Sequence, residues 1–162
     1  SRSGGEKRSE PARMAAANTV RKFIDSLLII DSASKIIVMG DLNDDPVSNS
    51  VTKGLKATSD TKNIGTDDLY NPWVGMYKSG QGTLAYQDAW SLFDQILFSS
   101  SFLNRNQKGF FYYRHHVFKA DYMIENTGRY KGYPMRTYNG DVYRGGYSDH
   151  FPTYIVLLKK VK

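Results

Sequence analysis

The sequence predicts one α+β domain that spans residues 1–162. Its hydrophobic share of 40% and aromatic share of 14% are enough to form one core in a chain of this length. Apolar residues recur at helical spacing near the start of the chain, and later runs are rich in β-branched and aromatic residues, as strands are. No apolar run approaches the roughly 20 residues that cross a bilayer, so we expect no membrane span.

The first expected element is an amphipathic helix that follows Ser9. Residues 1–9 are mostly Gly, Ser and charged residues, and we expect them to be extended or mobile. Ser9 would cap the helix, with Glu10 and Pro11 in its first turn. The face that packs on the domain would hold the apolar Ala16, Val20, Phe23, Ile24, Leu27 and Leu28, and the opposite face Asn18, Arg21, Lys22 and Asp25.

Residues 35–40 form a short run of mostly β-branched residues. Almost no polar residue interrupts the run, which predicts a strand buried on both faces. It ends at Gly40, and four Asp or Asn side chains follow within residues 41–45. Such residues satisfy free backbone groups in turns, but one turn does not need four of them. A turn and a functional site are therefore both open interpretations of this segment.

The middle of the chain holds several shorter elements. We expect a short helix in 46–55, a polar loop in 57–68, a cover over one edge of the core in 69–77, and a hairpin of strands 83–87 and 91–98. Asp94 interrupts the second of these strands, where a charged carboxylate is costly to bury without a partner. No partner lies nearby in sequence, so we predict a distant histidine or arginine.

The last third of the chain contains a strand candidate at 110–118 and a Gly- and Tyr-rich segment at 121–146. Long loops of this kind are uncommon in compact domains unless they serve binding. Arg136 lies in this loop, and its planar guanidinium would either clamp a phosphate or pair within the loop.

Charge is divided unevenly along the chain. The net charge is +6, yet residues 23–104 carry five basic and ten acidic side chains, whereas residues 105–136 carry seven basic and two acidic ones. This pattern is typical of a protein whose basic rim attracts anions, and also of a protein that happens to be basic. The absence of cysteine excludes disulfides, thiolate metal sites and cysteine nucleophiles.

Three short polar segments lie at the ends of expected strands. They are Gly-Asp-Leu-Asn at 40–43, Asp-Gln-Ile at 94–96 and Ser-Asp-His at 148–150, the last of which, taken alone, is more typical of a polar turn before a strand. Strand ends can meet at one rim of a layered sheet. Together these side chains would suit a hard cation, which prefers oxygen ligands, and an activated water.

These segments, in this order, resemble the C-terminal half of the endonuclease/exonuclease/phosphatase superfamily. That superfamily includes pancreatic deoxyribonuclease, abasic-site endonucleases, neutral sphingomyelinases and inositol polyphosphate 5-phosphatases. The opening residues 1–6 with Arg13, and the segments 132–138 and 145–147, look most like its bacterial hydrolase branch. The resemblance implies a deoxyribonuclease-I-like four-layer α/β/β/α sandwich and hydrolysis of phosphate esters with Mg²⁺ or Mn²⁺.

The resemblance also implies a role for each matching residue. His150 would be the general base or a phosphate contact, oriented by Asp94. Asp41 would orient or deprotonate the attacking water and contribute to the metal site, together with Asp149. Asn43 would bind a phosphate oxygen.

One departure from the family pattern is large. The family's first half, with its Asn, its metal-binding Glu and another His, has no counterpart here, and Glu6 and Glu10 precede the first helix instead of ending a strand. We therefore expect a sheet with one bare face, completed by an N-terminal portion of the domain or by a second copy of the chain. Weakened metal binding and catalysis would follow if nothing supplied these groups.

A second class of function fits the same residues. The chain would then be a catalytically inactive binding or scaffold module that uses the basic, aromatic segment 105–136 to bind a phosphate-containing ligand such as nucleic acid. The sequence does not separate nucleic acid, phospholipid headgroup, sugar phosphate and inositol phosphate as substrates. It leaves the compartment open, export included.

Overall fold

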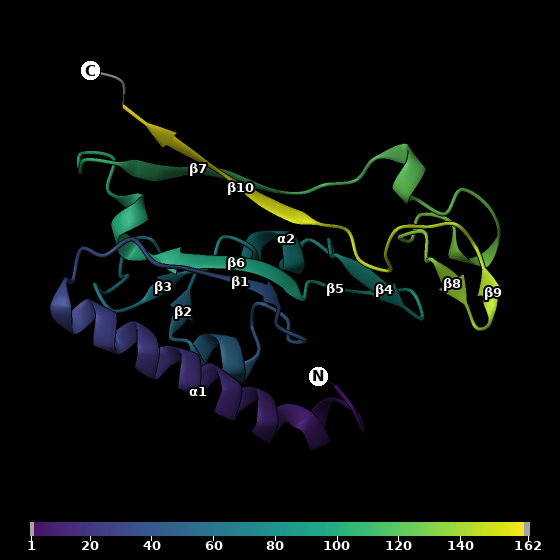
Figure 1. Ribbon diagram of the computed structural model, residues 1–162, viewed down its shortest axis with the longest axis horizontal. Coiled ribbons are helices and arrows are strands. Elements are labelled where there is room, and N and C mark those ends of the chain that lie inside the picture. The colour runs from purple at the N-terminus through teal and green to yellow at the C-terminus, as the bar shows by residue number, and fades with distance from the viewer. Residues whose placement is uncertain (1, 161–162) are drawn as a thin grey trace.

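A computed structural model describes residues 2–160 and has three layers (Figure 1). A long helix, α1 (Glu6–Ile30), lies along one side of a four-stranded sheet, and a two-stranded ribbon lies on the other side. The sheet has the order β1-β6-β3-β2, made of β1 (Ile37–Asp41), β6 (Asp94–Ser99), β3 (Leu69–Tyr70) and β2 (Ala57–Thr58). The ribbon pairs β7 (Phe110–Val117) with β10 (Thr153–Lys159) in antiparallel fashion.

This mixture of helix and strand confirms the α+β class. The four-layer sandwich stays a prediction, because Figure 1 shows α1 as the one long helix of residues 2–160, on the side of the sheet away from the ribbon. The remaining elements are η1 (Ser50–Gly54), α2 (Val74–Lys78), β4 (Leu84–Tyr86), β5 (Ala89–Ser91), η2 (Ser100–Leu103), η3 (Asp121–Met123), η4 (Gly128–Tyr130), β8 (Tyr138–Asn139) and β9 (Val142–Tyr143).

The expected hairpin is present but shorter than predicted. β4 pairs with β5, and Tyr86 lies opposite Ala89, so the turn consists of two residues, Gln87 and Asp88. The strand β6 begins three residues after β5 and pairs instead with β1 and β3. The run 91–98 is therefore divided between two sheets.

The start of α1 differs from the prediction. The helix begins at Glu6, with Gly5 at its N-cap, and Ser9 lies inside the first turns. The Ser9 hydroxyl donates to the backbone oxygen of Gly5 at 2.7 Å, a bond back along the helix that is not a cap. The residues from Glu6 onward are thus helical, and the extended segment expected for 1–9 is shorter.

The buried face of α1 is also rotated from the predicted one. Ile24 and Leu28 are buried as expected, but Phe23 is 66% exposed and Arg21 is buried. Arg21 is accommodated because its guanidinium pairs with Asp25 at 2.7 Å and donates to the backbone oxygen of Leu55 at 3.3 Å. Among residues 2–160, no helix has both the length and the apolar character needed to cross a membrane.

The prediction that residues 35–40 form a strand buried on both faces is wrong. The strand exists as β1, but it is the edge of its sheet, and Met39 is 72% exposed. The strand buried on both faces is the central β6, where Leu97 and Phe98 are fully buried. β1 thus leaves apolar side chains on the surface. That an N-terminal portion of the domain or a second copy of the chain covers them stays a prediction.

The hydrophobic core packs α1 against the sheet and also contacts the ribbon through Val117 and Ile155. Trp73 is fully buried, as the sequence predicts for 69–77, and its indole N–H donates to the backbone oxygen of Ile96 at 3.0 Å. The core gathers side chains from α1, η1, β2, β3 and β6 and from the residues next to η1, α2 and β6, namely Ala17, Ile24, Leu28, Val51, Leu55, Ala57, Leu69, Trp73, Leu92 and Leu97. This packing fixes the carboxyl end of β1 next to the start of β6.

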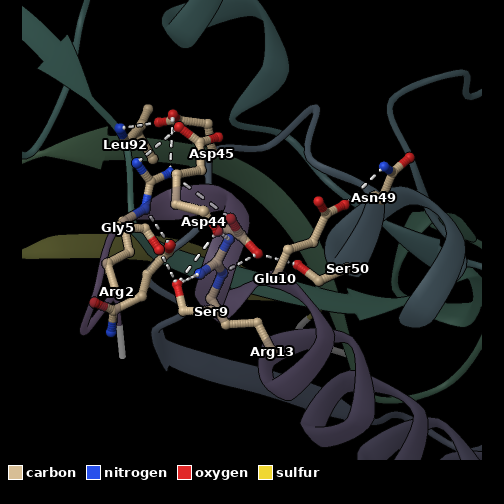
Figure 2. Close-up of polar contacts among 12 residues, drawn as sticks. Arg2, Gly5, Ser9, Glu10, Arg13, Asp44, Asp45, Asn49, Ser50 and Leu92 are labelled. Atoms are coloured by element: carbon tan, nitrogen blue, oxygen red, sulfur yellow. Dashed lines mark hydrogen bonds and ion pairs between the residues drawn. The ribbon is translucent and has the colours of Figure 1, made fainter.

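A buried polar network anchors the loop that follows β1 (Figure 2). Its centre is Asp44, which is 1% exposed and accepts a hydrogen bond from Nε of Arg13 at 2.7 Å and another from the Ser50 hydroxyl. Arg2 approaches Asp44 at 3.7 Å and donates through Nε to the backbone oxygen of Asn43 at 2.8 Å. The loop is therefore held from two points on the N-terminal segment.

Strand β6 and the residues just before it also hold this loop. The side-chain amide of Gln95, which is buried, donates to the backbone oxygen of Asp44 at 2.7 Å. Asp45 accepts a hydrogen bond from the backbone N–H of Leu92 at 2.7 Å. The position of residues 41–45 thus depends on residues that lie some fifty positions later in the chain.

Candidate active site

The centre of the candidate site is a hydrogen-bonded pair of Asp94 and His150. Asp94 is the first residue of β6, and His150 lies shortly before β10. Nδ1 of His150 lies 2.7 Å from Oδ2 of Asp94, and each side chain is 21% exposed. The structure thus supplies the distant partner that a carboxylate in an apolar strand requires.

The position of His150 is fixed by its neighbour Phe151. Phe151 is fully buried, and its backbone N–H donates to the backbone oxygen of Thr83 at 2.7 Å. Its ring stacks on that of Trp90, with the centroids 6.2 Å apart, and the ammonium of Lys119 lies 4.7 Å from Trp90 and 5.0 Å from Phe151. This packing therefore anchors the backbone next to His150.

The second predicted residue, Asp41, is the last residue of β1 and lies directly opposite Asp94 in the antiparallel pairing. Its carboxylate accepts the backbone N–H of Asn43 at 2.8 Å, an Asx turn. This turn holds Asn43 in the left-handed region, with φ of 51°. A non-glycine residue in that region is unusual and is often found at functional sites.

Asn43 is the predicted site residue that the structure least connects with the others. Asp41 and Asn43 both line a cavity of about 300 Å³ between α1 and the loop after β1, and His150 is not part of this lining. Asp41 is therefore shared between the two regions, and the predicted phosphate contact of Asn43 stays a prediction.

Asp149 and Arg136 lie together at the outer side of the site. A guanidinium nitrogen of Arg136 lies 3.7 Å from Oδ2 of Asp149, and both side chains are about half exposed. Gly146 brings their segments together, because a Cβ there would lie 1.9 Å from the backbone oxygen of Met135, so a side chain has no room. An exposed pair at this separation is weak, which leaves Arg136 free to exchange Asp149 for an anionic ligand.

The carboxylates around His150 change its acid–base behaviour. The hydrogen bond to Asp94 raises the pKa of His150 above its ordinary value of 6.5, and the negative charges of Asp94, Asp149 and Asp41 add to this effect, while burial opposes it. The pair therefore stabilises the fold fully below about pH 6.5, and this contribution is lost as the pH rises through the higher folded pKa.

Replacing Asp94 with asparagine is expected to lower the pKa of His150. The asparagine keeps the shape of the side chain but removes the charge that stabilises the imidazolium. An NMR titration of the imidazole nitrogens measures this shift, with His115 and His116 as internal references, since the chain has three histidines. An unchanged midpoint for His150 would show that the pair does not govern its protonation.

The residues gathered here do not by themselves form a metal site. In the described part of the chain, no group of three or more His, Asp or Glu side chains is arranged to hold a metal ion. Asp94 is engaged with His150, and Asp149 faces Arg136. The carboxylates of Asp41 and Asp149 are oxygen donors of the type that Mg²⁺ and Mn²⁺ prefer, but two such groups do not fit the complete ligand set of a hard cation.

The acidic segment 41–45 combines both interpretations that its sequence left open. Asp44 and Asp45 are structural, since they bind Arg13 and the backbone N–H of Leu92. Asp41 alone of the three carboxylates faces the candidate site, where it adds to the field at His150. No signal within the segment separates these roles, because the partners are distant in sequence.

Sequence reasoning missed the support of the site. Lys119, Trp90 and Phe151 come from three separate segments, and their stacking had no local signal in the sequence. Burial lowers the pKa of Lys119. A basic residue that contacts two stacked aromatic rings next to His150 could have been inferred only after β5 and the end of the chain were placed together.

Comparison with known proteins identifies the family. A family model described as the Endonuclease/Exonuclease/phosphatase family matches residues 1–159, which is nearly the whole chain. Comparisons with curated proteins and with solved structures give no match. The matched region contains all three polar segments, with Asp41 at the end of β1, Asp94 at the start of β6 and His150 shortly before β10. The chain therefore belongs to the endonuclease/exonuclease/phosphatase family.

Proposed function

We propose that this protein is a hydrolase of phosphate esters, either a phosphodiesterase or nuclease or a phosphatase, in which His150 and Asp94 perform the acid–base chemistry. Family membership supports a phosphoester hydrolase in general. The observation that carries the more specific proposal is the 2.7 Å hydrogen bond between Asp94 and Nδ1 of His150, within a group of carboxylates.

The pair has a clear chemical use. Asp94 accepts a hydrogen bond from the Nδ1–H of His150 and so leaves Nε2 as the nitrogen that meets the substrate. As a neutral imidazole, His150 would accept a proton from the attacking water, and as an imidazolium it would contact a phosphate oxygen. Because its pKa is raised, the neutral form gains population at a higher pH than for a free histidine.

The neighbouring residues would position the reactants. We assign Asp41 to the attacking water, because it lies opposite Asp94 and adds to the field at His150. Asn43 would donate a hydrogen bond to a phosphate oxygen after its side chain changes conformation. Arg136 would form a bidentate contact with the phosphate in place of its weak pairing with Asp149.

A divalent cation, Mg²⁺ or Mn²⁺, is proposed as the cofactor on the basis of the family, whose members generally use divalent metals. Asp41 and Asp149 would be the protein ligands, and further oxygen ligands have to come from the substrate, water or groups beyond those gathered at His150.

The test is hydrolysis of an aryl phosphodiester, bis(4-nitrophenyl) phosphate, by the purified chain. We expect release of 4-nitrophenolate with Mg²⁺ or Mn²⁺ and loss of this activity with EDTA. Equal activity with and without EDTA would refute the metal dependence. The absence of hydrolysis with both Mg²⁺ and Mn²⁺ would contradict the proposal that this chain is an active hydrolase.

A second candidate function is a binding module without turnover. It is favoured by one observation, which is that residues 2–160 hold no three-ligand metal cluster. The segment 105–136 would then bind a phosphate-containing ligand through its net positive charge. Affinity for a single-stranded oligonucleotide should fall steeply between low and moderate salt, and a salt-independent affinity would count against this function.

A further inference from the structure

A sizeable cavity lies beside the candidate active site and not within it. It has a volume of about 490 Å³ and is enclosed by the β4–β5 hairpin and by the segment 121–146. That volume is in the range of cavities that bind small organic ligands. Arg136, which pairs with Asp149 next to His150, also lines this cavity, so the two regions adjoin.

The cavity is held in shape by specific bonds. The Tyr133 hydroxyl donates to Oδ1 of Asp88 at 2.6 Å and accepts from the backbone N–H of Asp88 at 2.7 Å. Gln87 and Asp88 both have positive φ, of 50° and 64°, in the two-residue turn. Non-glycine residues at positive φ are strained in this turn. Both residues line the cavity, so the strained turn forms part of its wall.

Among the charged groups that line the cavity, the arginines are the ones available to a ligand. Its lining contains two carboxylates and three arginines. Asp88 is engaged with Tyr133, and Glu125 lies 3.4 Å from Arg144. Arg136 has a weak pairing with Asp149, and Arg129 lies 5.9 Å from the ring of Tyr130. Two guanidinium groups are therefore free to bind an anion, and their fork geometry suits phosphate.

Aromatic rings lead from the cavity to Phe151, which is next to His150 in the chain. Tyr130 contacts Tyr133 at 5.7 Å between centroids, Tyr133 contacts Trp90 at 5.7 Å, and Trp90 stacks on Phe151, the residue after His150. Tyr130 is 47% exposed, so one side of its ring is available to a ligand. An exposed aromatic ring of this kind is typical of sites that bind bases, because any of the bases can stack on it.

We propose that this cavity binds one nucleotide unit, with its base against Tyr130 and its phosphate at Arg129 and Arg136. The part of the proposal that places this unit next to the scissile phosphate rests on the proposed hydrolase function. The same chemistry is offered by a free nucleoside monophosphate and by the end of a single strand of nucleic acid. The substrate class is accordingly nucleotide-containing.

The test measures the affinity of the whole chain for AMP by isothermal titration calorimetry, with EDTA present to prevent turnover. Ribose 5-phosphate and adenosine serve as truncated probes, and each is expected to bind at least about tenfold more weakly than AMP because it lacks the stacking or the charged contact. An oligonucleotide of five thymidines distinguishes a strand end from a free nucleotide, according to which of the two binds more tightly.

Variants of the cavity have a matched control in the same basic segment. Arg114 lies 5.7 Å from the ring of Tyr113 on β7, much as Arg129 lies 5.9 Å from Tyr130, but neither Arg114 nor Tyr113 lines the cavity. We expect Arg129→Gln and Tyr130→Ala each to weaken AMP binding about tenfold. Tyr130→Phe should keep the affinity, and Arg114→Gln and Tyr113→Ala should leave it unchanged.

Each other outcome has a definite meaning. Equal losses in the two pairs of variants would overturn the cavity as the site, in favour of a diffuse basic surface. Ribose 5-phosphate that binds as tightly as AMP would overturn a nucleotide in favour of a sugar phosphate. Hydrolysis of the aryl diester without AMP binding would refute the cavity alone, and AMP binding without hydrolysis would refute only the hydrolase function.

Discussion

Replacing His150 with alanine is expected to reduce the hydrolysis of bis(4-nitrophenyl) phosphate by about 10²- to 10⁴-fold, the usual contribution of a positioned acid–base residue. The variant removes the imidazole that Asp94 orients at 2.7 Å. The loss should appear mainly in kcat, because proton transfer occurs in the transition state and not in the bound ground state. Initial rates over a range of substrate concentrations measure it.

The control for this variant is His116→Ala. His116 lies on β7 with its ring 5.2 Å from that of Tyr154, outside the candidate site. Its replacement should leave the rate near that of the unmodified protein, and thermal melting verifies that both variants remain folded. If His150→Ala and His116→Ala have similar rates, the assignment of His150 as the acid–base residue is wrong.

The pH profile gives an independent check of the same residue. If His150 acts as a base, the rate rises with pH through its raised pKa, so the acidic limb lies above pH 6.5. Asp94→Asn should move that limb to lower pH, in the same direction as the NMR midpoint. A limb that stays in place while the NMR midpoint moves would assign the limb to another group.

The partner of Asp94 could be inferred from the sequence because burial makes an unpaired carboxylate costly in a strand as apolar as β6. That requirement is local and depends on residue type alone. It specified a distant cation or hydrogen-bond donor, and the structure brings His150 to Asp94. The family resemblance carried the choice among the histidines and arginines of the chain.

The faces of α1 and of β1 could not be inferred in the same way. Periodicity places Arg21 with the polar residues, but the helix buries it because Asp25 and a backbone carbonyl neutralise the cost of desolvation. The run 35–40 is as apolar as a central strand, yet β1 is an edge, since strand order depends on long-range pairing with β6. The composition of a strand shows that it could be buried, but it does not show which strands lie beside it in the sheet.

The segment 41–45 shows the same limit at the site itself. The four Asp and Asn side chains of this segment are more than one turn needs, which made a functional site an open interpretation. Their division between structure and function depends on Arg13, 31 positions away from Asp44, and on Gln95, 51 positions away. Only the assembled fold separates Asp41 from Asp44.

The largest expected effect on stability comes from the buried pair of Arg13 and Asp44. Their side chains are 5% and 1% exposed, and Nε of Arg13 donates to the carboxylate at 2.7 Å. Replacing Arg13 with methionine keeps much of the side-chain volume but leaves a buried carboxylate without its closest cation. We expect the free energy of unfolding to fall by about 3–5 kcal/mol, as is usual when one partner of a buried pair is removed.

Urea denaturation followed by circular dichroism measures this change, and Lys56→Met is its matched control. Lys56 pairs with Asp67 at 2.9 Å, but both side chains are about half exposed, so solvent screens the pair and its loss should matter little. The double variant Arg13→Met with Asp44→Asn should recover part of the lost stability, because the uncompensated charge is gone. If Arg13→Met lowers the free energy of unfolding no more than Lys56→Met does, then Arg2 and Gln95 are sufficient to hold the loop. Asp41 is in that case positioned without Arg13.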